Sequence, residues 1–427
     1  MSWDNRDPKR AHKAFIACTG TAYRRRRHLS STELFARKAS GLARNISAYE
    51  VLIFDIMWMW PVGTWIYGIW AMLMFPGVDL PTTTLISWVV SIVVAAFYAT
   101  FSSSMPRSGG DYIWMSRVLH PAIGYAMNFF FAVACTSFVG VCTFYLTGSL
   151  GSMFDFLGNT GLASWLNSVE GTLVIAVPLY IFFGALISSG VRRTHIFIWV
   201  LFVIGMIAIV VYNVTLLSVG SAGFKANFNA FSGMDYDKVI MAGTQAGVPA
   251  SYTLGSTILG VAFTYFSFTG YNCSIYHSAE IKDVRKSQFI AIVGSTLIYV
   301  CILYIDYFVT VTTVGPVFYN SLTYLWGTGS PEYILAFPPF FQNVFRYACI
   351  GNPAAYAFVC IGFAALTLAS LAAWFFSPTR MIFAWAFDRV VPVSLAKIDT
   401  KYSSPYVAII LVTVGNIVTM LLYAYTN

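Results

Sequence analysis

The chain has 427 residues, of which 58% are hydrophobic and only 10% are charged. An ordinary soluble domain carries about 25% charged residues, so this composition excludes a water-soluble fold. The formal net charge of +8 could suggest nucleic-acid binding, so the distribution of the basic residues along the chain has to be considered before a partner is inferred.

Long apolar blocks divide the chain into segments that can cross a membrane. A spanning helix needs roughly 20 apolar residues, and a β-barrel strand would alternate apolar with polar residues instead. These blocks are apolar all round, so we predict an all-α polytopic membrane protein with about nine spans. The spans lie near residues 51–74, 84–104, 122–149, 170–189, 195–218, 255–275, 289–315, 352–376 and 405–425.

The basic residues predict the orientation of these spans. If the N-terminus is cytoplasmic, 22 of the 25 Lys and Arg residues lie in cytoplasmic segments. The three outside are Lys225, Lys238 and Arg346. The positive-inside rule therefore predicts a multi-pass protein of the cell membrane, with the N-terminus in the cytoplasm and the C-terminus outside. The run Arg24–Arg27 can also bind anionic lipid or a partner.

Two regions follow from this pattern, a basic cytoplasmic tail at 1–47 and a transmembrane domain at 48–427. Two outer loops, 219–254 and 316–351, exceed the roughly 15 residues usual in compact proteins, so we expect them to be functional or partly structured. The second is rich in aromatic residues and should pack over the outer mouth of the bundle or along the membrane interface. The cysteines have no CxxC spacing and predict neither disulfides nor a metal site.

Two spans carry helix-breaking residues at mid-membrane depth. Proline removes a backbone donor, and glycine loosens the helix. In the first span the stretch is Trp60, Pro61, Val62, Gly63 and Thr64. In the sixth span it is Phe266, Ser267, Phe268, Thr269, Gly270 and Asn272.

Such interruptions leave backbone groups without helical partners, which hydrocarbon tolerates only where protein, water or a solute satisfies them. N–H groups after the first break would face a carboxylate, and carbonyls that end the half-helices would face an ammonium or a cation. A zwitterion suits both. Taken singly, Pro61 can be a simple kink and Gly270 a point of close helix packing.

The placement of the two breaks favours a transporter. Each break lies in the first span of a five-span unit, the units being spans 1–5 and spans 6–10. Interrupted helices at corresponding positions in the two halves of a transporter indicate a solute site. We therefore predict a five-plus-five inverted-repeat fold. Repeat one would cover about 48–218, and repeat two, without its tenth span, about 255–427.

At these residues the chain resembles the amino acid–polyamine–organocation (APC) superfamily of permeases, whose fold is two inverted five-helix repeats. The resemblance covers about residues 44–427 and includes the inner-loop string MPRSGGDYIWMSRVLHPAIGYAMNF. The Phe-rich sixth span is followed by an acidic residue, Glu280. After the eighth span, Arg380, Asp388, Pro392 and Pro405 fall in register with the family pattern.

The chain also departs from this family. Asn272 stands where many relatives carry Glu, and Gly205 stands where some proton-coupled relatives carry Lys. The family typically has twelve spans. The shortfall leaves three alternatives: a truncated sequence, a shortened protein, or a second chain that completes the bundle.

Four polar residues within the spans are candidates for coupling to a proton or to sodium. Asp55 lies six residues before Pro61, about 9 Å along a helix. It can take a coupling proton, pair with an arginine of the inner gate, or lie hydrated near the headgroups. Asp306 is deeper, so we expect it to have a partner. Thr367 and Ser370 can offer hydroxyls to sodium, as in some members of the fold, or bond to neighbouring helices.

These features predict a secondary active transporter that moves an amino acid or a related small amine by alternating access. Trp60, Phe266 and Phe268 would gate or line the site between the breaks. No organic cofactor, nucleic acid or enzyme activity is expected, since no HExxH or GxSxG string occurs and no histidine lies mid-span. The alternative is a transport-inactive membrane scaffold or an accessory subunit of a larger complex.

Overall fold

The computed structural model describes residue 42 and residues 44–426. The predicted basic tail, with its run Arg24–Arg27, therefore lies outside the described residues except at its last positions. Within the described residues the chain is helical and contains no β-strand, apart from one isolated bridge between Ile46 and Ile281. This confirms the all-α prediction.

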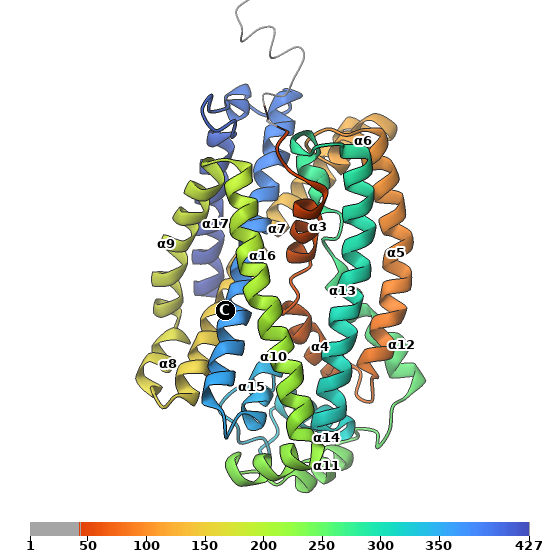
Figure 1. Ribbon diagram of the computed structural model, residues 1–427, viewed down its shortest axis with the longest axis vertical. Coiled ribbons are helices and arrows are strands. Elements are labelled where there is room, and N and C mark those ends of the chain that lie inside the picture. Colours follow the sequence, from red (N-terminus) through yellow and green to blue (C-terminus); the bar gives the residue numbers. More distant parts are fainter. Residues whose placement is uncertain (1–41, 43, 427) are drawn as a thin grey trace, which may run out of the picture. The chain divides into compact units, whose positions relative to one another are not determined.

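Eight helical segments of the described chain are long and apolar enough to cross a membrane (Figure 1). Each coincides with one of the predicted apolar blocks, apart from at most one residue of the block at either end, which confirms a polytopic protein. The first is made of two helices, α3 (Ala48–Trp58) and α4 (Gly63–Met74). The others are α5 (Leu80–Ser104), α7 (Pro121–Phe156), α9 (Val169–Ser188), α10 (Val191–Phe231), α13 (Val284–Val314), α16 (Pro353–Phe387) and α17 (Tyr406–Thr426).

The sixth predicted span, 255–275, is not one continuous helix. It consists of the α-helix α12 (Leu254–Thr264) and two 3₁₀ segments, η1 (Phe266–Phe268) and η2 (Cys273–Glu280). The pieces are separated by the extended backbone of Thr269 and by Gly270, whose φ of 116° is open to glycine and strained for other residues. The number of spans is nine only if this interrupted segment is counted.

Short helices make up much of the connecting segments. The loop 219–254 holds the end of α10, which turns at Gly220, and α11 (Tyr236–Gln245). The loop 316–351 holds α14 (Pro316–Gly327), α15 (Phe341–Phe345) and η3 (Arg346–Ala348). The remaining short helices are α6 (Asp111–Val118), α8 (Thr160–Leu166) and η4 (Val393–Ala396).

We call the end of the bundle at which α3 begins, which also carries α6, the inner end, and the end that carries α11 and α14 the outer end (Figure 1). The aromatic loop 316–351 lies at the outer end, and its Phe341 is buried against Trp65 and Tyr307. This loop therefore packs over the outer mouth of the bundle, as predicted. Whether the inner end faces the cytoplasm remains a prediction.

The interrupted first span and α16 form the centre of the bundle. In the most apolar stretch of Ala48–Met74, 89% of the residues are buried, and in that of α16 the share is 83%. The corresponding shares are 28% in α5 and 33% in α10. Among these eight segments the two central ones are therefore the most enclosed by protein, whereas α5 keeps apolar side chains such as Val93 and Phe97 exposed, as expected next to lipid.

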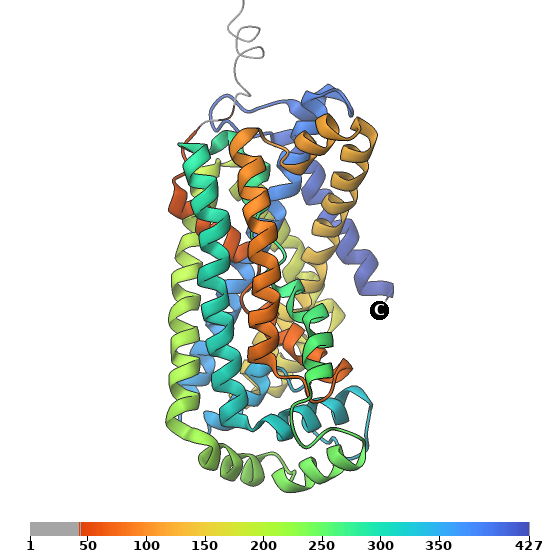
Figure 2. The same ribbon diagram turned by 90° about the vertical axis from the view of Figure 1, so that its right-hand side faces the viewer.

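The helices of the two halves pack against one another in corresponding pairs. The second span, α5, lies along the seventh, α13, and the fourth, α9, lies along the ninth, α17 (Figures 1 and 2). This pairing is what inverted repeats would produce, although the repeat boundaries stay a prediction. The fifth span, α10, approaches α16 so closely that a Cβ on Gly205 would lie 2.1 Å from Leu366 Cγ. A side chain at Gly205 would therefore require Leu366 to move.

Candidate functional site

The first predicted break is a true interruption of the helix. Trp60 has a φ of 54°, which is uncommon for a bulky residue, and Pro61 has no N–H to donate. The Trp60 ring folds back over Gly63, where a Cβ would lie 1.9 Å from the ring. The chain therefore ends one helix at Trp58 and starts another at Gly63, which places the first N–H groups of α4 inside the bundle.

Aromatic side chains satisfy the carbonyl groups at the end of α3. Trp374 Nε1 of α16 donates to the Trp58 carbonyl at 2.8 Å, and the Tyr299 hydroxyl of α13 donates to the Met59 carbonyl at 2.8 Å. Beyond the break, the Tyr307 hydroxyl donates to the Thr64 carbonyl. Protein donors therefore occupy one acceptor position on each of these carbonyls, and their second lone pairs leave the predicted contact with an ammonium or a cation a prediction.

The two breaks touch each other at Gly270. A Cβ at this position would lie 2.5 Å from the Trp58 ring and 3.0 Å from the Trp58 carbonyl oxygen. Trp58 is itself held to α16, because its Nε1 donates to Ser377 Oγ at 2.9 Å. The structure thus brings the two interrupted helices together beside α16 in the middle of the bundle (Figure 1).

The predicted aromatic residues occupy different surroundings. Trp60 is buried against Phe138, Tyr145 and Trp374. Phe268 is fully buried and packs on Tyr299. Phe266, in contrast, is 48% exposed, and Thr269 is exposed as well. The structure therefore places Trp60 and Phe268 in the interior and leaves Phe266 and Thr269 at the edge of the second break.

The two hydroxyls predicted on the eighth span are both fully buried. Thr367 Oγ1 donates to the Phe363 carbonyl at 2.9 Å and accepts from Trp60 Nε1 at 3.3 Å. Ser370 Oγ has no hydrogen-bond partner among the described residues. Buried hydroxyls are usually paired, so Ser370 is the one of the two that is available to a bound solute or ion.

Asp306 has the partners that its depth led us to expect. Its Oδ1 accepts from Asn213 Nδ2 of α10 at 2.7 Å, and its Oδ2 accepts from Trp65 Nε1 of α4 at 3.2 Å. This carboxylate therefore ties the outer half of the first span to α10. Trp65 also stacks on Tyr212, within 4.6 Å between ring centroids.

Asp55 is fully buried, so it does not lie hydrated near the headgroups. It also forms no ion pair with any described arginine. Its carboxylate accepts from the backbone N–H and from the hydroxyl of Ser274, each at 2.8 Å. Asp55 therefore links the inner half of the first span to η2. The interpretations that it pairs with an arginine of the inner gate or lies hydrated near the headgroups are wrong, and its role in proton coupling stays a prediction.

A buried ion pair that the sequence did not predict lies at the inner end. Arg380 Nε of α16 is 2.9 Å from Glu280 Oε1 of η2, and Nη2 is 3.3 Å from Oε2. The Glu280 carbonyl also accepts from the backbone N–H groups of Asn45 and Ile46, just before α3. Family resemblance singled out both charged residues, but their pairing had no signal in the sequence.

The glycine-rich inner loop docks on η2. Gly109 N–H donates to the Tyr276 carbonyl at 3.1 Å, and a Cβ on Gly110 would lie 2.5 Å from Ile275. Next to the loop, Asp111 accepts from Asn128 Nδ2 at 2.7 Å, and Asn128 accepts from Trp385 Nε1 at 2.8 Å. Burial raises the pKa of Asp111 to about 6, while the hydrogen bonds from Asn128 and from the Tyr112 N–H oppose this rise.

This pKa predicts how stability depends on pH. The folded value lies above the ordinary value of 3.8, so the unfolded chain binds fewer protons between about pH 4 and pH 6. The free energy of unfolding should therefore fall as pH rises through that window, by at most about 3 kcal/mol. Asp111→Asn cannot ionise, so it does not lose this stability. The difference between the Tm of this variant and the Tm of the unmodified chain should therefore shift in favour of the variant as pH rises. A difference that stays constant from pH 4 to pH 7 would contradict this.

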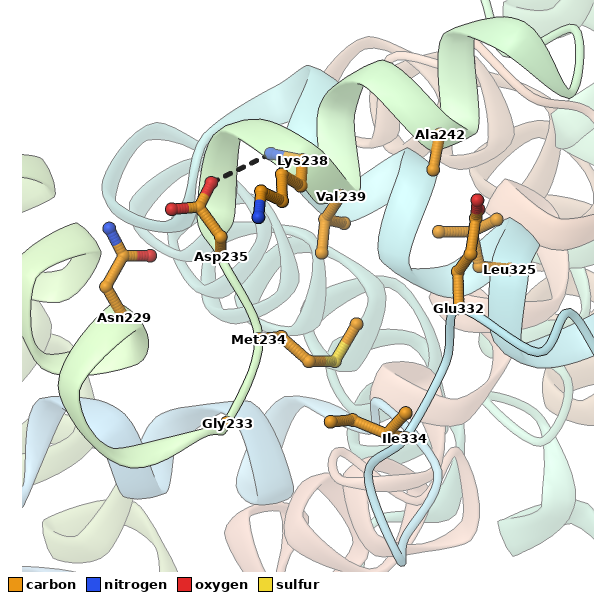
Figure 3. A pocket seen from close by; sticks show the side chains of 10 residues that line it. All are labelled: Asn229, Gly233, Met234, Asp235, Lys238, Val239, Ala242, Leu325, Glu332 and Ile334. Carbon is orange, nitrogen blue, oxygen red and sulfur yellow. Dashed lines mark hydrogen bonds between the residues drawn. The ribbon is translucent and has the colours of Figure 1, made fainter.

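A separate pocket of about 550 Å³ lies at the outer end (Figure 3). It is lined by residues of the end of α10, of the α10–α11 connection, of α11 and α14, and of the segment around Glu332 and Ile334. Asp235 caps α11 there by accepting from the Lys238 N–H at 3.0 Å. None of the residues predicted for the solute site lines this pocket.

Comparisons with known proteins agree with this architecture. A family model described as "Amino acid permease" matches residues 59–427. The methylthioribose transporter of Bacillus subtilis (strain 168) is 22% identical over 384 residues, which cover 86% of this chain and 73% of that protein. The branched-chain amino acid permease BcaP of the same organism is 24% identical over 388 residues, which cover 86% and 72%.

The match to the family model covers most of the chain and includes the break at 60–64, α4 and the whole interrupted sixth span, but begins just after α3. The protein is a multi-pass membrane transporter for amino acids or related small molecules and not an enzyme. It belongs to the amino acid permease family and, with it, to the APC superfamily.

Proposed function

We propose that the chain is a secondary active permease whose solute binds where the two interrupted helices meet, and that it works by alternating access. The observation that carries the proposal is the contact of the two breaks at Gly270 and Trp58, beside α16. Interrupted helices that meet at mid-depth expose backbone groups which a solute can satisfy. The N-terminus of α4 carries a partial positive charge that suits a carboxylate, with Gly63 N–H already donating to the Trp60 carbonyl at 2.8 Å.

The surroundings of the breaks favour a solute with an uncharged side chain. Trp60, Phe138 and Trp374 surround the first break, and Ser370 contributes a hydroxyl without a partner. Asn272 supplies no carboxylate that would bind a cationic side chain. One relative is named for branched-chain amino acids and the other for methylthioribose, so both solutes belong in the first screen.

The proposal is tested on the full chain in detergent and then in liposomes. Thermal shift with the twenty amino acids, methylthioribose and a set of polyamines should show stabilisation by one group of chemically similar solutes. The same solutes should then enter liposomes and exchange across them. A folded chain that responds to no solute in either assay would overturn the permease assignment in favour of a scaffold.

Ser370→Ala tests the position of the site. Since Ser370 Oγ has no protein partner, its removal should leave the Tm unchanged and weaken solute binding about three- to tenfold, the value of one hydrogen bond. Ser321→Ala is the matched control, because Ser321 Oγ of α14 is also buried without a partner. Equal affinities in both variants would exclude Ser370 from the site.

A further inference from the structure

Asp55, Ser274 and Gln288 form a buried hydrogen-bond network that joins three elements at the inner end. Asp55 belongs to α3, Ser274 to η2 and Gln288 to α13, and all three are fully buried. Ser274 Oγ lies 2.8 Å from Asp55 Oδ2 and 3.0 Å from Gln288 Oε1. One hydroxyl therefore faces two acceptors.

The orientation of the Gln288 amide is set by its other contacts. Gln288 Nε2 lies 3.1 Å from the Ser274 carbonyl oxygen, which can only accept. Its second hydrogen points to Ser278 Oγ at 3.1 Å, and that hydroxyl uses its own hydrogen on the Ile275 carbonyl. The Gln288 oxygen must therefore be the atom that faces Ser274 Oγ.

Counting hydrogens distinguishes the two charge states of Asp55. A serine hydroxyl has one hydrogen, so it cannot serve an ionised Asp55 Oδ2 and Gln288 Oε1 together. With a proton on Asp55 Oδ2, the acid donates to Ser274 Oγ, and Ser274 donates to Gln288. Every buried polar atom of the network then has a partner, while Asp55 Oδ1 keeps the Ser274 N–H at 2.8 Å.

The second buried carboxylate lacks this feature. Asp306 Oδ1 and Oδ2 each have their own donor, from Asn213 and Trp65, so an ionised Asp306 is fully paired without an added proton. The hydrogen count thus separates two aspartates between which the sequence left the choice open.

No described charge compensates an ionised Asp55. On η2, Glu280 is paired with Arg380 of α16, and Cys273 and His277 are buried. On α10, the imidazole of His195 packs on Phe54, while the basic residues of α13 near this end are Arg285 and Lys286. None of these side chains forms an ion pair with Asp55 among the described residues.

From this geometry, and resting on the proposed function, we infer that Asp55 is the binding site of a coupling proton. The proton completes the contact between the inner halves of the two interrupted helices and so holds the inner end closed. When Asp55 releases the proton to water at the inner end, the carboxylate and Gln288 compete for one hydrogen and the contact with Ser274 weakens. Solute and proton then leave together as α3 separates from η2.

The test uses the full chain in liposomes that contain a pH-sensitive dye, with the membrane potential clamped at zero. The solute is radiolabelled L-leucine, or methylthioribose if the thermal-shift screen selects it. With the outside one pH unit more acidic, one proton per solute supports roughly tenfold accumulation. The unmodified chain should approach this limit and acidify the lumen when solute is added.

Asp55→Asn mimics the protonated acid, because its Nδ2 can donate to Ser274 Oγ. This variant should lose both the accumulation and the acidification, since the amide cannot release a proton, and should exchange solute more slowly than the unmodified chain, since its contact with Ser274 holds the inner end closed. Asp237→Asn is the matched control, an exposed aspartate at the outer end that should retain all three activities. Gln288→Leu removes the competing acceptor and should move the pH profile of uptake to lower pH.

The outcomes separate the two proposals. Accumulation that persists in Asp55→Asn, or that is lost in Asp306→Asn but not in Asp55→Asn, would overturn the assignment to Asp55. Solute uptake by the unmodified chain that ignores the pH gradient would also overturn it, while the permease function stands. If Asp55→Asn does not fold, Gln288→Leu provides the test instead. An unchanged pH profile of uptake in that variant would overturn the assignment to Asp55. No uptake or exchange by the folded unmodified chain would overturn the permease function and this inference with it.

Discussion

Glu280→Gln should be one of the most destabilising single substitutions in this protein. Arg380 and Glu280 are both fully buried, and the guanidinium would keep its charge without a counterion. Removing one partner of a buried ion pair costs about 3–5 kcal/mol. We expect the Tm to fall by roughly 5 °C, measured by thermal unfolding of the detergent-solubilised chain.

Two controls show whether the burial of the charge is the cause. The double variant Glu280→Leu with Arg380→Met removes both charges and should regain most of the stability, because apolar residues of similar volume replace a buried pair at little cost. Asp237→Asn breaks the exposed pair with Lys225 and should cost less than about 1 kcal/mol. A Glu280→Gln chain as stable as the unmodified protein would show that Arg380 finds another partner or water.

The ion pair also predicts an effect on transport. Glu280 connects η2 to α16 through its side chain and to the residues before α3 through its carbonyl. If this contact holds the inner end closed, the double variant should be stable yet leak solute down its gradient. If the double variant is stable and still transports solute without a leak, the ion pair contributes to folding but not to the closure of the inner end.

The second large effect is expected from Gly270→Ala. The φ of 116° is strained for alanine by about 1–3 kcal/mol, and the added Cβ would lie 2.5 Å from the Trp58 ring. Trp58 cannot move aside freely, because its Nε1 and its carbonyl are both bonded to α16. We expect a lower Tm and a loss of uptake of more than about tenfold, since a small misplacement of a site can cost about two orders of magnitude.

Gly255→Ala is the matched control for this substitution. Gly255 lies in α12, has helical geometry and has no heavy atom within 4 Å of the added Cβ. Alanine there should leave uptake unchanged and raise the helix stability slightly. If Gly270→Ala transports as well as Gly255→Ala, the two breaks do not need to touch for transport.

Local properties of the sequence determined the spans and their interruptions. Apolar length is set by the thickness of hydrocarbon, so the spans could be placed from hydropathy alone. Pro61 and Gly270 act on their own backbone, so the breaks at 60–64 and 267–272 could also be predicted. The family resemblance rested on the same local strings. The division into repeats is still a prediction, because symmetry is a relation between distant segments.

Only the tertiary structure decided which partners the polar groups find. Asp55 meets Ser274 across 219 positions of sequence, and Arg380 meets Glu280 across 100. Likewise, the carbonyls at the first break are bonded by Trp374 and Tyr299, which come from two later spans. In hydrocarbon every polar group must be satisfied inside the protein, but many donors can do so, and the packing of the helices alone selects among them.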